Sequence, residues 1–158
     1  MKRNIALVLA LIMCLCLFTA CGGKDEAKSD PGFEAVSTAV NGVADSDIMQ
    51  LIPDSYMQNS MKITSEDYTD CVAKISKVGV NINEYGVFKT DDPDALKELL
   101  ESYLEYREEI WMDEYLPEEH PKLENAQVWV VDNYVMYAIL DTETMDAAET
   151  AFKGCFEG

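Results

Sequence analysis

Two strand-rich hairpin segments separated by one long amphipathic segment are the feature that most constrains the fold. Between them, Thr90, Asp91 and Asp92 offer caps for a helix, and Pro93 suits its first turn, where the missing N–H costs nothing. The apolar residues that follow fall on one stripe: Leu96, Leu99, Leu100, Tyr103, Leu104, Ile110 and Trp111. The pattern predicts a helix that continues to about Tyr115 and is ended by Pro117.

Strand-like residues flank this helix on both sides. Residues 68–80 and 85–89 predict a first hairpin, and residues 126–131 and 134–140 predict a second. Helical spacing predicts a short helix over 33–43 and a final helix that starts at Thr142, whereas 45–63 is expected to be a loop with one helical turn. The order indicates an α+β domain with an antiparallel sheet made of two hairpins. The long helix lies between the hairpins in sequence, a C-terminal helix follows them, and the helices pack on the sheet.

The second hairpin has two apolar faces. Asp132 and Asn133 tolerate a tight turn, and pairing across them puts Trp129 opposite Met136. Alternation gives one face to Val128, Val130, Val135, Tyr137 and Ile139, and the other to Trp129, Val131, Tyr134 and Met136. We expect the first or last helix to cover the second face, which would otherwise be a contact patch for a protein or glycan.

The N-terminal residues have the composition of an export signal. Lys2 and Arg3 precede an apolar run over 5–18, and Thr19 and Ala20 supply small residues before Cys21. This segment resembles a bacterial lipoprotein signal peptide, although Phe18 replaces the usual leucine, and the resemblance implies lipid attachment at Cys21. The alternative, an uncleaved anchor, fits less well because the run is about 14 residues and a span needs about 20.

The rest of the chain divides into a tether and one domain. Residues 1–20 are predicted to be the signal peptide, 21–32 a flexible polar tether and 33–158 a single domain. The 158-residue chain has 30 acidic and 12 basic residues. That balance argues against a nucleic-acid partner, because phosphate binding depends on Lys and Arg.

Cys71 and Cys155 are the two cysteines of the predicted domain. Outside the cytoplasm they could form a disulfide. Each precedes an apolar residue, however, as a buried free cysteine often does, so free thiols are the expectation.

His120 is the sole histidine and lies between Pro117 and Pro121. A metal site or a nucleophilic triad there would need partners from elsewhere, and a proline-bracketed loop explains the residue more simply. We therefore expect no catalytic residue, metal or cofactor. The alternative is an enzyme or a metal- or ligand-binding domain, with its site at His120 and neighbouring carboxylates.

A family resemblance covers residues 71–152. It rests on residues 85–89, Tyr-Gly-Val-Phe-Lys, before the long helix, on 115–118, Tyr-Leu-Pro-Glu, on 123–126, Leu-Glu-Asn-Ala, and on 132–135, Asp-Asn-Tyr-Val. In these the chain resembles an uncharacterised domain family of lipoproteins and secreted proteins from clostridia and related Gram-positive bacteria. The resemblance implies a compartment and a fold, and no chemistry.

These inferences combine into one expectation. The chain is predicted to be a lipid-anchored domain on the extracytoplasmic face of the cell membrane, with a non-enzymatic binding or structural role in the envelope. Its partners would be the membrane, reached through Cys21, and an envelope protein or glycan.

Overall fold

The computed structural model describes residues 29–112 and 114–157, which form an α+β fold. The elements follow in this order: α2 (Phe33–Ala44), β1 (Met49–Leu51), α3 (Asp54–Tyr56), the π-helix η1 (Met57–Met61), β2 (Asp70–Ser76), β3 (Glu84–Lys89), α4 (Pro93–Glu109), α5 (His120–Glu124), β4 (Gln127–Val131), β5 (Tyr134–Ile139) and α6 (Thr142–Gly154). Over these residues no helix is long and apolar enough to span a membrane. The predicted signal peptide and Cys21 lie outside the described residues, as does most of the predicted tether.

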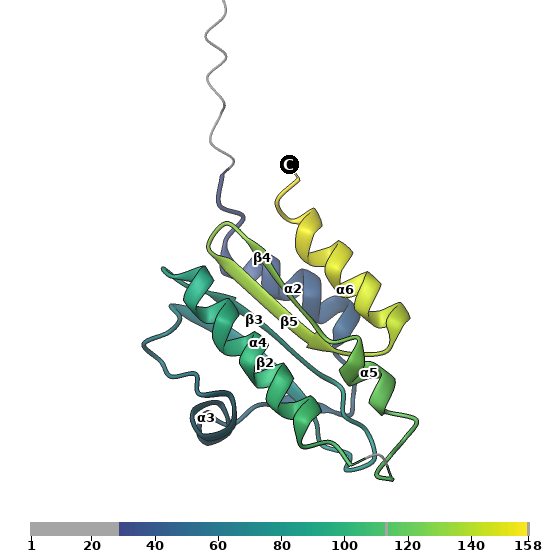
Figure 1. Cartoon of the computed structure of the whole chain (residues 1–158). Helices are drawn as coiled ribbons and strands as arrows, with labels where there is room; N and C mark the ends of the chain where they lie inside the picture. Colours follow the sequence, from purple (N-terminus) through teal and green to yellow (C-terminus); the bar gives the residue numbers. More distant parts are fainter. Residues whose placement is uncertain (1–28, 113, 158) are drawn as a thin grey trace, which may run out of the picture.

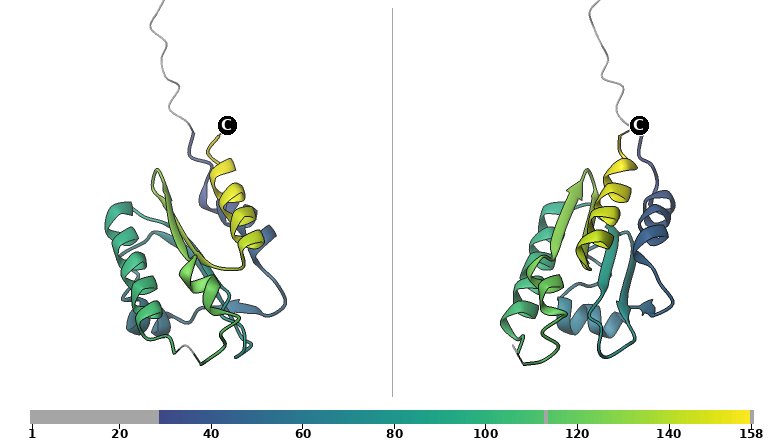
Figure 2. Two further views of the ribbon diagram at one scale, coloured as in Figure 1. Left: turned by 45° about the vertical axis from the view of Figure 1, so that its right-hand side comes forward. Right: turned by 90° about the vertical axis from the view of Figure 1, so that its right-hand side faces the viewer.

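The sheet is antiparallel throughout, with the strand order β1-β2-β3-β5-β4. Helices cover both of its faces, so three layers stack (Figures 1 and 2). On one face, α2 and α6 pack on side chains from β3 and β5, such as Tyr85 and Met136. On the other face, α4 and η1 pack on Phe88, Val135 and Tyr137. The predicted fold class is confirmed.

Side-chain caps begin the two longer helices that follow strands. Asp92 accepts a hydrogen bond from Ala95 N at 3.1 Å before α4, and Asp141 accepts one from Thr144 N at 3.0 Å before α6. These bonds satisfy backbone donors that a helix start leaves free. Both starts were predicted.

The long helix ends earlier than predicted, at Glu109 instead of near Tyr115. Leu96, Leu100 and Tyr103 are buried on the sheet, whereas Ile110 is 53% exposed. Because Ile110 is not buried in the core, the apolar spacing alone does not continue the helix.

Two short elements were missed. Strand β1 lies in the segment predicted as a loop, and it forms because Met49 and its neighbours pair with the edge of β2. Helix α5 includes Pro121 in its first turn, where proline is tolerated, so the proline-bracketed segment is partly helical. The local sequence pattern predicts neither element. Strand β1 depends on pairing with a strand that is distant in sequence, and the prolines around α5 are typical of a loop.

Gly86 allows β3 to pass under large aromatic side chains. A Cβ atom at this position would lie 2.6 Å from Tyr137 Cε1 and 2.9 Å from Phe88 Cε2. Such contacts are too close for a side chain, so the glycine lets the rings of Tyr137 and Phe88 pack over the backbone of the central strand.

Candidate functional site

The second hairpin has the predicted register, and helices cover the face that carries Trp129. Trp129 pairs with Met136 and Val131 with Tyr134. Trp129 is 7% exposed, Tyr134 and Met136 are fully buried, and Val131 packs against them beneath α2 and α6. The alternative that Trp129, Val131, Tyr134 and Met136 form a partner surface is wrong, because the two helices occupy that face.

The two cysteines lie on opposite sides of the sheet. Cys71, on β2, packs with the cluster under α4, and Cys155, at the end of α6, packs with the cluster under α2 and α6. Both are free thiols. Burial raises the pKa of Cys71 to about 12, so its thiol stays protonated near neutral pH. The structure does not bring the two residues together into a redox pair.

A buried carboxylate, which the sequence analysis missed, is the centre of the largest polar cluster. Glu84, at the start of β3, is fully buried. Its Oε1 accepts hydrogen bonds from the hydroxyls of Tyr103 (2.8 Å) and Tyr137 (2.7 Å). Its Oε2 accepts one from Arg107 Nη1 at 2.7 Å. The signal that could have identified this buried carboxylate is an acidic residue at the start of a strand of mostly apolar residues.

The hydroxyl groups of Tyr103 and Tyr137 donate their hydrogen bonds to Glu84 within this cluster. Burial, and then the charge of Glu84, raise the pKa of Tyr103 and of Tyr137, so both phenols keep their protons. Since Tyr103 gives its one proton to Glu84, the contact of 2.8 Å with Tyr56 has Tyr56 as donor. Arg107 also donates to Tyr103 at 2.7 Å. The cluster is a buried network that ties α4 to the sheet, and burial keeps Glu84 out of reach of a substrate.

A groove of about 370 Å³ lies beside this network, between η1 and α4. Met61, Leu99 and Tyr103 form its apolar part, and Asn59 and Ser102 are among its polar residues. It contains no histidine, cysteine or carboxylate. Lys62 and Tyr106 also line it, and its apolar part can hold an apolar group.

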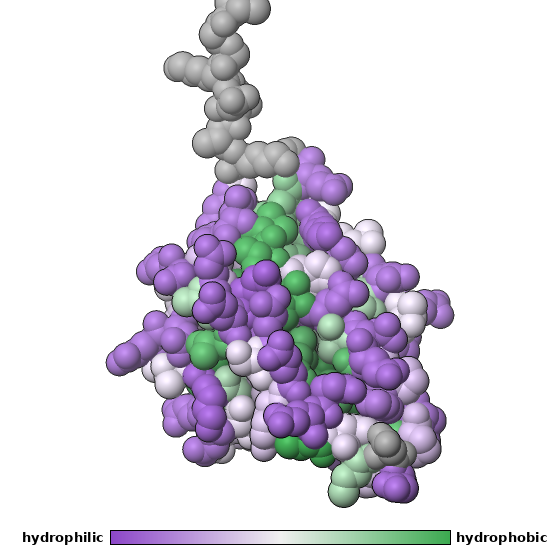
Figure 3. Space-filling model, in the orientation of Figure 1, coloured by the Kyte–Doolittle hydropathy of each residue, from purple (hydrophilic) through white to green (hydrophobic). Residues whose placement is uncertain are grey.

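The end of the molecule opposite the C-terminus carries most of the exposed large apolar side chains. Two connections lie there, residues 77–83 and 110–119 (Figures 1 and 2). A hydrogen bond of 3.1 Å from the Tyr115 hydroxyl to Gly79 O joins them. The exposed apolar residues of these connections are Val78, Val80, Ile110, Met112 and Tyr115, which we call the distal patch. In Figure 3, green surface emerges among purple at this lower end.

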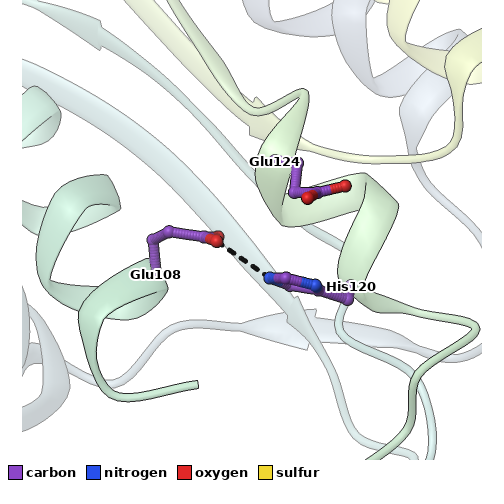
Figure 4. Close-up of side chains that lie close together, drawn as sticks. All are labelled: Glu108, His120 and Glu124. Carbon is purple, nitrogen blue, oxygen red and sulfur yellow. Dashed lines mark hydrogen bonds and ion pairs between the residues drawn. The ribbon is translucent and has the colours of Figure 1, made fainter. Parts of the chain in front are cut away.

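His120 meets two glutamates near the same end. Its Nε2 lies 2.8 Å from Oε1 of Glu108, which is in the last turn of α4. Glu124 lies one helical turn after His120 on α5, so the spacing of four residues puts both on one face (Figure 4). One ligand atom from each of the three residues lies within 4.8 Å of the other two.

The imidazole of His120 also stacks on an indole. The rings of Trp111 and His120 are 5.3 Å apart between centroids, and their planes differ by 6°. This contact restrains the orientation of the His120 ring. Sequence reasoning identified His120 but not Glu108 or Glu124. The spacing from His120 to Glu124 was a usable signal, whereas Glu108 is brought close only by the fold.

Comparison with known proteins gives one match. A family model described as a domain of unknown function (DUF4358) matches residues 43–140, more than half of the 158-residue chain. No curated protein and no solved structure matches. The matched range runs from the end of α2 through β5, so it includes Glu84, Arg107 and the His120 cluster.

Proposed function

The chain belongs to the DUF4358 family, and from this premise we propose that it is a membrane-tethered, extracytoplasmic module that binds a protein partner in the cell envelope. In this proposal the domain does no catalysis of its own. Its anchor is a lipid on Cys21, and its binding surface is the distal patch. The observation that carries the proposal is that exposed apolar side chains gather at the end of the molecule opposite the first described residues.

The start of the described chain is fastened at the opposite end from the distal patch. The Asp30 carboxylate accepts hydrogen bonds from the Tyr134 hydroxyl (2.7 Å) and from Lys89 Nζ (2.5 Å). The hydrogen bond from Lys89, followed by those from Tyr134 and the Gly32 amide, lowers the pKa of Asp30 to about 2. Asp30 thus stays ionised and bound, so a tether that arrives there would leave the distal patch facing away from a membrane.

The composition of the distal patch favours a protein partner. Val80 and Met112 are both 65% exposed, Ile110 is 53% exposed and Tyr115 is 50% exposed. Exposed apolar side chains gathered in one place mark interaction surfaces, and aromatic residues and methionine are enriched in protein interfaces. The formal net charge of −18 on the chain would disfavour acidic partners and favour basic ones.

An enzyme with its site at His120 is the competing proposal. The cluster offers an imidazole beside a carboxylate, which general acid–base catalysis could use. Yet Glu108 and Glu124 are exposed, and the hollow that they line is open to solvent. The distal patch therefore has the stronger claim.

The tether is tested by Cys21→Ala. The variant should lose membrane retention or stall in processing, because a diacylglyceryl group on Cys21 supplies two acyl chains and two chains give stable anchoring. Cell fractionation followed by mass analysis of the N-terminus measures both effects. Unchanged retention together with an unmodified N-terminus would refute the tether.

The binding surface is tested by site-specific photocrosslinking in cells. A photoreactive amino acid at Met112 should give a discrete crosslinked product with one protein. Leu51 is the matched control position, because it is 66% exposed against 65% for Met112 but lies on the edge strand β1. The product should be absent from the Leu51 position.

Ile110→Asp supplies the second control, introduced in the chain that carries the crosslinker at Met112. A charge in the middle of an apolar interface should abolish the product while leaving the fold intact, because Ile110 is 53% exposed. Identical crosslinks from Met112 and Leu51, or crosslinks that persist in Ile110→Asp, would contradict the proposed surface.

A further inference from the structure

We propose that Glu108, His120 and Glu124 bind a zinc ion, which fastens α5 to the last turn of α4. The site comes from the ligand geometry and does not depend on the proposed partner. It departs from the expectation of no metal, which rested on the absence of ligands near His120 in the sequence. The fold supplies two such ligands, one from each helix.

The distances between the three ligand atoms are close to those that a bound zinc ion requires. Zinc bonds to histidine nitrogen and carboxylate oxygen are about 2.0–2.2 Å, which puts neighbouring ligands of a tetrahedral ion roughly 3.3 Å apart. Here His120 Nε2 and Glu108 Oε1 are 2.8 Å apart, and all three ligand atoms lie within 4.8 Å. Both glutamates are exposed, so rotation of their side chains can close the shell without moving the backbone.

The surroundings of the cluster lack a cation. Glu105, Glu108, Glu109 and Glu124 line one hollow of about 540 Å³ together with Leu104 and Leu123. The nearest basic side chains in the sequence are engaged elsewhere: Arg107 pairs with Glu84, and Lys122 pairs with Glu119. Within the described part of the chain, Glu105, Glu109 and Glu124 form no ion pair. The hollow therefore has uncompensated negative charge next to an imidazole.

The donor types select zinc over the hard cations. Calcium and magnesium prefer six or more oxygen ligands, whereas one imidazole nitrogen with two carboxylates is a set that zinc accepts. Three protein ligands leave one coordination position for water. Bound zinc would join the two ends of the connection 110–119, which carries Ile110, Met112 and Tyr115 of the distal patch.

The test is a titration of the full chain, in detergent micelles with a reductant that does not bind metals, with zinc chloride by isothermal calorimetry. We expect one zinc per chain at this site and a higher melting temperature with zinc. His120→Ala and Glu124→Gln should each weaken binding at least about tenfold, since even residues that only support a metal site cost that much. Glu124→Gln should not change the melting temperature without zinc, because Glu124 is exposed, whereas His120→Ala also removes the contact with Trp111 and is therefore compared with the unmodified chain by its zinc affinity.

Glu105→Gln is the matched control. Glu105 lies in the same hollow and on the same helix as Glu108, but it is not one of the three ligands. It should bind zinc as the unmodified chain does. If it weakens binding as much as Glu124→Gln, the attraction is diffuse and the site is refuted.

Cobalt separates this site from the chain's thiols. Cobalt in place of zinc should give only weak ligand-field absorption, as nitrogen and oxygen ligands do. An intense sulfur-to-metal charge-transfer band would show that cysteines bind the ion and would overturn the proposal. So would unchanged zinc affinity in His120→Ala.

Discussion

Arg107→Met is expected to destabilise the protein by about 3–5 kcal/mol, the cost of leaving a buried charge without its partner. Glu84 is fully buried and the Arg107 side chain is only 15% exposed. The substitution keeps the length of the side chain but removes the donor that lies 2.7 Å from Glu84 Oε2. Urea unfolding of the full chain, followed by circular dichroism, measures the change in the free energy of unfolding.

Two controls identify the cause of this loss. Lys97→Met removes a similar charge from an exposed pair with Glu101 on the same helix and should change stability by less than about 0.5 kcal/mol. Adding Glu84→Gln to Arg107→Met should recover part of the loss, because the unpaired charge is then gone. A loss below about 1 kcal/mol in Arg107→Met would mean that Glu84 does not depend on the arginine.

Trp129→Ala is expected to cost about 3–5 kcal/mol, as removal of a buried aromatic side chain does. Trp129 is 7% exposed and belongs to the cluster that α2 and α6 cover, so its loss would leave a cavity between the sheet and these helices. Thermal unfolding of the full chain gives the shift.

The matched control is Leu51→Ala, also on an edge strand but 66% exposed. It should change stability by no more than about 0.5 kcal/mol. Equal, small effects of the two substitutions would mean that the helices do not depend on the Trp129 face.

The two predictions probe opposite faces of the sheet and should therefore be independent. Trp129 packs with α2 and α6, whereas Arg107 and Glu84 join α4 to the other face. Substitutions without shared contacts add in their effects on stability. A combined Trp129→Ala and Arg107→Met chain should thus lose nearly the sum of the two, and it would be too unstable to fold if its total stability lies at the low end for such domains.

The sequence by itself determined the elements whose signals are local. The long helix begins after Asp92, one of the predicted caps, and the last helix begins at Thr142 as predicted, because a cap such as Asp92 or Asp141 requires only the residue and the amide three positions later. The second hairpin has the predicted register, because alternation and the Asp132-Asn133 turn define it together. Asp132 adopts the left-handed conformation expected there, with φ at 51°. The alternation of the hairpin residues also identified the face that carries Trp129.

Only the tertiary structure decided the features that depend on contacts between distant residues. Strand β1 exists because β2 offers it an open edge. Helix α4 stops at Glu109, and the apolar residue that follows, Ile110, is 53% exposed instead of packed in the core. Glu84 meets Arg107 across 23 positions, and Glu108 meets His120 across 12. Neither pair has a local pattern, because helix α4 brings its last turn to the sheet and to α5 only once the core has packed. Both the buried network and the zinc site are therefore products of the fold.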